Sequence, residues 1–188
     1  PLAELAIVGG VTVDRAEVRL VNATPPSVAD LGPIRIKGEP IPEPEAPAGG
    51  GVSLDVSIDA PRNVFVRGRG LDSEWRIDMD VTGTAAEPLV TGVIERIRGQ
   101  LSLVGSILEL QRGEIRFTGA TPVDPALDIA LLRDAGDVTG GIVVRGYASD
   151  PEIAFESVPA LPQGEVLPRV LFGKSQQGLS PAESLELA

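Results

Sequence analysis

The sequence predicts an all-β fold built as one long antiparallel meander, on three observations. Apolar and polar residues alternate strictly over residues 52–59 and 75–82, which is the period of a strand with one buried face. The 188 residues include 22 glycines and 17 prolines, so turns are expected to be frequent. The hydrophobic share is 43% and the aromatic share only 3%, so Val, Ile and Leu are expected to fill the interior.

The first 51 residues are predicted to contain leading strands followed by a linker. Short apolar runs within residues 1–37 are separated by glycine and proline pairs, which indicates two or three strands. Residues 38–51 are rich in proline, which cannot donate a hydrogen bond to a strand ladder, and they end in three glycines. We therefore expect a linker or flexible loop there.

Residues 52–157 are predicted to form the main sheet. Beyond the two alternating segments, pairs of apolar residues two apart recur between glycines at 99, 105, 113 and 119, which we interpret as punctuation between strands. The predicted strands are 52–59, 63–71, 75–82, 101–103, 108–110, 115–117, 126–132, 141–145 and 152–156.

Residues 158–188 have a different character, and we predict a short helical segment. Residues 165–172 are consistent with a short amphipathic helix that holds Pro168 in its first turn. A serine at 180 followed by a proline and, three residues later, a glutamate predicts the start of a second helix that runs to Ala188 and is truncated there.

A short sequence motif of the main sheet occurs twice. Residues 81–92 and 144–155 share an apolar residue, a glycine two positions later, small residues, an acid, a proline and a new run. We interpret both copies as a strand end, a turn opened by glycine and a proline that blocks pairing before the next strand. The near-copy predicts a structural unit that is reused in a repetitive β architecture.

Composition excludes several classes of function. A net charge of −11 disfavours binding to nucleic acid and to anionic lipid head groups. The chain contains no cysteine and no histidine, so thiol and histidine catalysis and thiolate or imidazole metal sites are not expected. The acidic residues of 52–59 and 75–82 fall on the polar side of each strand, so we interpret them as solvated. We predict no enzyme, no metal and no cofactor.

Two further features bear on where the protein works. No window approaches the roughly 18 apolar residues that a membrane-spanning helix needs. The chain begins at Pro1, so we expect it to be a fragment of a longer protein.

The apolar side of the predicted strands permits two interpretations. It can form the core of a closed sandwich or barrel, or it can line an open groove. Alternation does not separate them, because each arrangement needs strands with one apolar face.

Ordered motifs over residues 52–188 resemble the C-terminal region of the TamB family. They are NVFVRGRGLDSEW at 63–75, VTGT at 81–84, an Arg-Gly pair at 98–99, RGEIRF at 112–117, DPALD at 124–128, GYASDPEI at 146–153, and VLFGKS at 170–175 with LSPA at 179–182. The first 51 residues are less distinctive.

The resemblance implies a fold and a function. It implies a tapered, folded-over open sheet with an apolar interior, called a β-taco, in a periplasmic protein that an N-terminal helix tethers to the inner membrane. It implies a TamA-like outer-membrane β-barrel as partner. It also implies that the groove conducts phospholipid between the inner and outer membranes. The alternative is a scaffold that assists the assembly or secretion of outer-membrane proteins such as autotransporters by strand pairing, and a third possibility is a structural spacer with a closed core.

The resemblance and the one-sided strands together predict which side chains face the lipid. The predicted groove-lining residues are Val52, Leu54, Val56, Ile58, Trp75, Ile77, Met79, Val81, Leu101, Leu103, Leu108, Leu110, Ile115, Phe117, Ile142, Val144, Ile153 and Phe155. The C-terminal segment is predicted to contact the partner or to plug the groove, through Leu167, Val170, Leu171 and Phe172.

Overall fold

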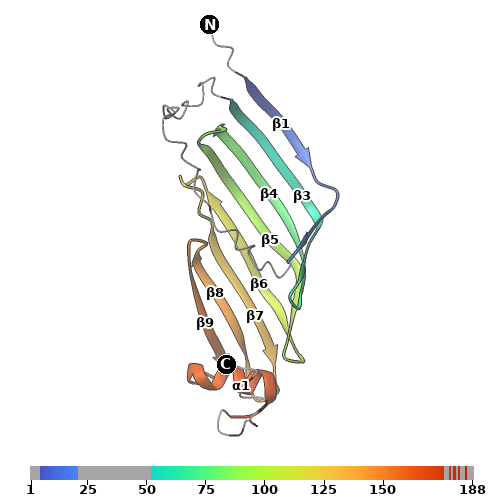
Figure 1. Ribbon diagram of the computed structural model, residues 1–188, viewed down its shortest axis with the longest axis vertical. Coiled ribbons are helices and arrows are strands. Elements are labelled where there is room, and N and C mark those ends of the chain that lie inside the picture. The colour runs from blue at the N-terminus through green and yellow to red at the C-terminus, as the bar shows by residue number, and fades with distance from the viewer. Residues whose placement is uncertain are drawn as a thin grey trace, which may run out of the picture.

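The structure is a computed structural model that describes residues 5–20 and 52–175, together with the single positions Gly178, Ser180, Ala182 and Leu185. Within these residues the chain forms one nine-stranded sheet and one helix (Figure 1). The elements are β1 (Ala6–Thr12), β2 (Ala16–Arg19), β3 (Ser53–Gly68), β4 (Leu71–Thr84), β5 (Pro88–Leu103), β6 (Ser106–Thr118), β7 (Ala126–Asp134), β8 (Thr139–Tyr147), β9 (Asp150–Val158) and α1 (Gln163–Phe172).

The sheet is open, which confirms the predicted fold class. Strands β3 to β9 follow one another as an antiparallel meander, and in the described chain β9 pairs only with β8. At the opposite edge β1 and β2 both lie beside β3, and both run parallel to it. The sequence predicts antiparallel pairing only, so these two parallel strands are an addition to the predicted order. Parallel pairing requires a long connection back to β3, and residues 21–51 lie between β2 and β3.

The meander has two distinct ends. At one end the chain turns between β4 and β5, between β6 and β7, and between β8 and β9; we call this the open end. At the other end, the helix end, the β3–β4 and β5–β6 hairpins lie on the same side of the sheet as α1 (Figure 1). The β3–β4 and β5–β6 hairpins are two-residue turns with positive φ at each central residue, Arg69 and Gly70 in one, Val104 and Gly105 in the other. Turns of this kind match the twist of the strands that they join.

The strands are longer than the alternation predicts. Strand β3 unites the predicted strand 52–59 with the first part of the predicted strand 63–71 across an irregularity between Ala60 and Val64, where Asn63 adopts a φ of 65°. The predicted end at residue 71 is wrong, because β3 ends at Gly68 and the chain turns at Arg69 and Gly70. Strand β6 likewise unites 108–110 and 115–117. The interpretation of Gly99 and Gly113 as punctuation is wrong, because both glycines lie inside strands. A Cβ at Gly113 would lie 2.8 Å from the Trp75 ring, so the glycine leaves space for that side chain.

The repeated motif of residues 81–92 and 144–155 forms the same hairpin in both copies, at the open end of the sheet. In the first copy Gly83 lies opposite Pro88, and in the second Gly146 lies opposite Pro151. The reuse is as predicted, but the proline does not block pairing, since it lies within β5 or β9. The sequence analysis also did not single out residues 88–98, which form the first part of β5.

Several predictions for the two ends of the chain have mixed outcomes. Two of the leading strands predicted in residues 1–37 are present as β1 and β2, whereas the predicted linker 38–51 lies outside the described residues. Helix α1 begins at Gln163, so Pro168 lies in its second turn and the predicted first-turn position is wrong. Most of the second predicted helix lies outside the described residues. None of the helical segments that the structure describes has the length and apolar character needed to cross a bilayer.

Candidate functional site

One face of the sheet is apolar from β3 to β9, and we call it the apolar face. Directly opposed residues of paired strands project to the same side of a sheet, so the strand register assigns each side chain to a face. Ile77, Ile94, Ile115 and Leu127 oppose one another in turn and form an apolar row across β4, β5, β6 and β7. Rows parallel to it repeat this character along the strands.

All the predicted groove-lining residues in the sheet project from this apolar face. The register places on it Leu54, Val56, Ile58, Trp75, Ile77, Met79, Val81, Leu101, Leu103, Leu108, Leu110, Ile115, Phe117, Ile142, Val144, Ile153 and Phe155, and Val52 lies directly before β3. Trp75, Leu108 and Leu110 are buried, Ile153 is 63% exposed, and the others are half-buried. The face is therefore partly open to solvent.

The sequence analysis missed further members of the apolar face. They come mainly from β5 and β7, and they are Val64, Val66, Val90, Ile94, Leu127, Ile129 and Leu131. The alternation of Leu127, Ile129 and Leu131 within a predicted strand was sufficient to find the β7 members. In β5 the alternation is interrupted by Gly92, which lies opposite Met79 and hides the period.

The apolar face is closed at its middle by a cluster of buried side chains. Ala60, Val64, Trp75 and Leu110 come from β3, β4 and β6 and are at most 7% exposed. The Trp75 indole donates a 2.9 Å hydrogen bond to the Ser73 hydroxyl, which satisfies its only polar group. We call these four residues the Trp75 cluster.

Helix α1 covers the apolar face at the helix end. Only four residues separate the end of β9 from α1, and the helix packs against β8 and β9. Of the residues predicted as a partner contact or lid, Val170 and Leu171 are buried while Leu167 and Phe172 are half-buried. Val166, which the prediction omitted, is fully buried. It is four residues before Val170 and so lies on the same side of the helix.

A polar contact fastens the last turn of α1 to the sheet. The Arg133 guanidinium donates hydrogen bonds to the carbonyl oxygens of Val170 and Leu171 and to the Ser106 hydroxyl, at 2.8 Å for the last of these. The Ser106 hydroxyl in turn donates to the Leu171 carbonyl at 2.8 Å. A cation at this position also interacts favourably with the helix dipole. The helix ends at Gly173, whose left-handed conformation (φ 67°) stops the helix.

The opposite face of the sheet is polar. Asp55, Asp59, Asp78 and Asp80 project from it and are all exposed, as expected for solvated strand polarity. Asp59 and Asp78 lie directly opposite each other. Among the residues that the structure describes, no group of three or more His, Cys, Asp and Glu side chains is placed to hold a metal ion.

Ion pairs cross the polar face from β6 to β9. Arg112 contacts Asp128 at 3.3 Å, and Arg145 forms a bidentate ion pair with Glu156. The hydrogen bonds from Arg145 lower the pKa of Glu156 below its ordinary value of 4.5. Exposed pairs of this kind contribute little individually, so their main effect is on the charge of this face.

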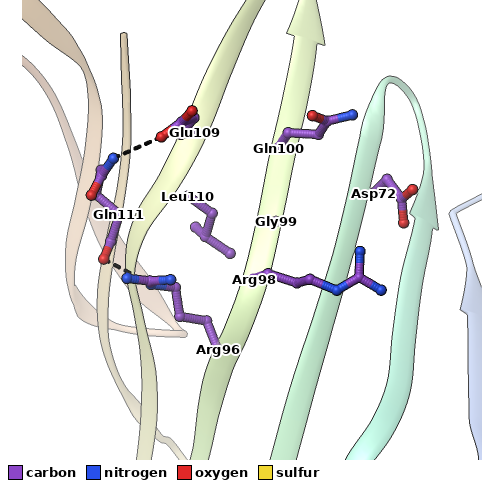
Figure 2. A pocket seen from close by; sticks show the side chains of 8 residues that line it. All are labelled: Asp72, Arg96, Arg98, Gly99, Gln100, Glu109, Leu110 and Gln111. Carbon is purple, nitrogen blue, oxygen red and sulfur yellow. Dashed lines mark hydrogen bonds between the residues drawn. The ribbon is translucent and has the colours of Figure 1, made fainter. Parts of the chain in front are cut away.

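Two cavities lie on the polar face, at the level where the strands are irregular. The first has a volume of about 360 Å³ and is shown in Figure 2, where Arg98 extends toward Asp72. Arg96 donates a 2.7 Å hydrogen bond to the carbonyl of Gln111, near the register shift in β6 (Figure 2). The second cavity, of about 930 Å³, shares Gln100, Glu109 and Gln111 with the first. Both are lined mainly by polar and charged side chains, and Leu110 of the Trp75 cluster contributes to the wall of the first.

The fold and the site together define a class of protein: an open β-sheet with one continuous apolar face, one charged face and a helix over one end. The family described as the TamB C-terminal domain matches residues 1–188 of this chain. The chain therefore belongs to the TamB C-terminal domain family.

A curated relative agrees with this assignment. The chain is similar to the translocation and assembly module subunit TamB of Haemophilus influenzae, with 26% identity over 129 residues. The aligned segment covers 66% of this chain and 10% of that protein. The chain thus corresponds to a small part of the length of the relative that it matches.

Proposed function

We propose that this domain is a non-enzymatic periplasmic module that conducts phospholipid acyl chains along its apolar face between the inner and outer membranes. In the full-length protein, an inner-membrane anchor and a TamA-like outer-membrane barrel would hold the two ends of the route. Family membership supports a module of the TamB kind, and the sheet supplies the surface on which the proposal rests.

The observation that carries the proposal is the continuity of the apolar face. It extends across every strand from β3 to β9, on the same side of the sheet before and after the three register shifts, and most of its side chains remain half-buried. Burial of an acyl chain gains roughly 0.8 kcal/mol per methylene, so an uncovered apolar face of this extent favours a ligand with long hydrocarbon tails. Head groups would stay in water at the rim.

The composition of the face suits movement of the ligand. Val, Ile and Leu dominate it, with Met79, Phe117 and Phe155 as larger members away from the Trp75 cluster. A wall of similar aliphatic side chains offers many nearly equivalent weak contacts, so a tail can slide from one to the next without a deep trap.

A second candidate function rests on the sheet edge. In the described chain β9 pairs on one side only, and its Ile153 and Val158 are 63% and 77% exposed. Unpaired strand edges recruit further strands. This observation favours a scaffold that assists the assembly of outer-membrane proteins by strand pairing, either with the client or with the barrel partner.

One pair of substitutions tests the lipid proposal. Val56→Arg places a charge on the apolar face, and Ser57→Arg places the same charge on the adjacent, exposed position of the polar face. A charge among acyl chains costs about 3 kcal/mol, so Val56→Arg should lower bound phospholipid on the order of a hundredfold. Native mass spectrometry of the purified chains measures the lipid that co-purifies.

The control separates the two candidate functions. Because Val56 is half-buried, an arginine there can extend to solvent, and the variant should keep the thermal unfolding of the Ser57→Arg chain. Equal lipid in both folded variants contradicts the lipid proposal. Absence of lipid from the unmodified chain, with photocrosslinks from β9 to polypeptide, supports the scaffold in its place.

A further inference from the structure

The depth of burial changes along the apolar face in three sections. The middle section is the Trp75 cluster, in which Ala60 is 0%, Val64 6%, Trp75 7% and Leu110 3% exposed. Toward the helix end lies a second section that α1 covers in part. Toward the open end lies a third section, where no apolar-face side chain of β3 to β6 is buried.

The Trp75 ring closes the middle section across three strands. It starts on β4 and reaches β6, because a Cβ at Gly113 would lie 2.8 and 2.9 Å from two of its ring carbons. The 2.9 Å hydrogen bond to Ser73 holds the indole in this orientation. Ile77, Ile94 and Ile129 pack against the cluster from the open-end side.

The backbone is irregular at the same level. The register shifts in β3 between Ala60 and Val64, in the β4–β5 pair beside Trp75, and in the β6–β7 pair after Leu110. An extra residue in a strand bends it and increases its twist. Three such shifts lie at the level of the Trp75 cluster.

The part of the helix-end section on β6 to β9 is filled by the chain itself, whereas Leu101 and Leu103 of β5 remain half-buried. Leu108 is fully buried there, and Val166 and Val170 of α1 are fully buried as well. Arg133 and Ser106 fasten the helix over this section. A ligand entering from the open end would meet the Trp75 cluster first and the covered section after it.

The open-end section has dimensions that suit one acyl tail. It extends from Val52, directly before β3, to Ile58, which is about 20 Å at roughly 3.3 Å per residue. The hydrocarbon core of a bilayer is about 30 Å thick and holds two tails end to end, so one tail needs about 15 Å. A tail therefore fits lengthwise on this section without passing the Trp75 cluster.

We propose that the Trp75 cluster is a barrier that confines the acyl chains to the open-end section of the apolar face. This inference rests on the lipid function proposed above and adds a binding subsite to it. Trp75 is then the specificity-determining residue, because its ring sets how far a tail extends along the strands.

Crosslinking on both sides of the cluster tests the barrier in the unmodified background. A photoreactive amino acid is placed singly at Met79 or Val81 in the open-end section, and at Leu101 or Leu103 beyond the cluster. All four positions are half-buried apolar-face positions, so the labels have comparable access. Exposed Asp80 and Ser102 on the polar face serve as matched controls. The probe is radiolabelled phosphatidylethanolamine in vesicles that also contain phosphatidylglycerol.

Each outcome decides a different point. The barrier predicts at least on the order of tenfold more lipid crosslinked from Met79 and Val81 than from Leu101 and Leu103, since passage requires displacement of a buried aromatic ring. Equal crosslinking from both sections overturns the barrier and leaves the lipid function standing. Crosslinking at the level of Asp80 and Ser102 from every position overturns both.

Removal of the ring supplies a second test. In a Trp75→Leu background, crosslinking from Leu101 and Leu103 should rise on the order of tenfold, toward that from Met79. Leu110→Ala, which removes a smaller member of the cluster, covers the case in which Trp75→Leu does not fold, and thermal unfolding reports which variant is folded. Unchanged crosslinking beyond the cluster in a folded variant overturns the barrier.

Discussion

At the scale of single residues, the contact between Trp75 and Gly113 determines how the middle of the sheet is packed. Two residues on strands that are not neighbours meet because Gly113 has no side chain to exclude the indole, although Arg96 lies between them on β5. A strand-interior glycine is normally unfavourable, since it contributes no side chain to packing. Here the missing side chain leaves space for the largest residue of the apolar face.

Gly113→Ala should therefore destabilise the protein. Alanine is normally the better strand residue, but its Cβ would lie 2.8–2.9 Å from the indole and from Arg96. Overpacking of this kind costs about 1–3 kcal/mol. Chemical denaturation of the wild-type and variant chains measures the change in the free energy of unfolding.

A double-mutant cycle isolates the contact. In a Trp75→Leu background the ring is absent, so Gly113→Ala should cost markedly less than it does beside the tryptophan. An identical cost in both backgrounds would show that the glycine is needed for a reason other than the indole.

The residue scale is also where the sequence was least informative. Trp75 was predicted on the apolar face, and the structure places it there, but its reach to β6 depends on a register that no local pattern encodes. Gly99 and Gly113 look the same in the sequence as the turn glycine Gly105. Their different positions follow from which side chains lie across the neighbouring strands.

At the scale of elements, α1 depends on a contact from a distant strand. Its N-terminal Pro162 makes no side-chain capping bond, and Pro168 within the helix has no N–H to donate. A ten-residue helix with these features is marginal by itself. Packing on β8 and β9 and the Arg133 hydrogen bonds therefore hold it in place.

Arg133→Ala should loosen the helix. It removes a charged donor from the carbonyls of Val170 and Leu171, at a cost of about 2 kcal/mol, which corresponds to roughly 4–8 °C in melting temperature for a chain of this length. Thermal unfolding measures the loss, and hydrogen exchange of the α1 amides locates it.

Arg116→Ala is the matched control for this prediction. Among the described residues, Arg116 pairs only with the half-buried Glu114 on its own strand, so its removal should cost less than about 1 kcal/mol. If both variants melt together, the Arg133 contact does not hold α1.

Element boundaries were predicted less well than element types. Every strand predicted from residue 52 onward overlaps an observed strand, because one-sided burial forces the two-residue period, but the predicted strand 63–71 runs through the β3–β4 turn. The joins were missed because bulges such as the one at Asn63 break that period while the backbone pairing continues beyond them. Residues 88–98 were missed because Gly92 occupies an apolar-face position with no side chain.

At the scale of the whole molecule, the two faces of one sheet have opposite chemistry. The apolar side has no second sheet against it in the described chain, while the other side holds carboxylates and the ion pairs that link β6 to β7 and β8 to β9. Several of these carboxylates contribute to the net charge of −11. The stability of the sheet should therefore depend on their ionisation.

Acidification should weaken the link between β8 and β9. The pKa of Glu156 is lowered in the folded chain by hydrogen bonds from Arg145, so folding favours its ionised form. This stabilisation is fully present above the ordinary pKa of 4.5, and it is lost as the pH falls through the lower folded value. The melting temperature of the unmodified chain should fall as the pH drops below 4.5. In the Glu156→Gln variant this fall should be smaller, because the substituted side chain no longer titrates.

Glu152→Gln serves as the control for acidification. Glu152 is exposed on the same strand and face, and no ion pair to it is found among the described residues. Its substitution should leave the pH profile of the melting temperature closer to that of the unmodified chain. Indistinguishable profiles for Glu156→Gln and the unmodified chain would contradict the role given to the Arg145–Glu156 pair.

The alternation of apolar and polar residues did not predict whether the sheet is open or closed. Closed and open sheets require the same one-sided strands, and the difference is whether the two edges meet. The family resemblance implied an open sheet, and the strand order confirms it, since β1 and β9 lie at opposite edges.

The repeated hairpin at the open end has a consequence for how such a sheet can change in size. Gly83 with Pro88 and Gly146 with Pro151 build the same connection at two places. Inserting or deleting one hairpin adds or removes two strands, about 10 Å of width, and leaves every later side chain on its original face. A single strand would reverse the direction of all that follow. Duplication of the gene segment for one hairpin is thus a simple route by which domains with this fold become wider while they keep one apolar face.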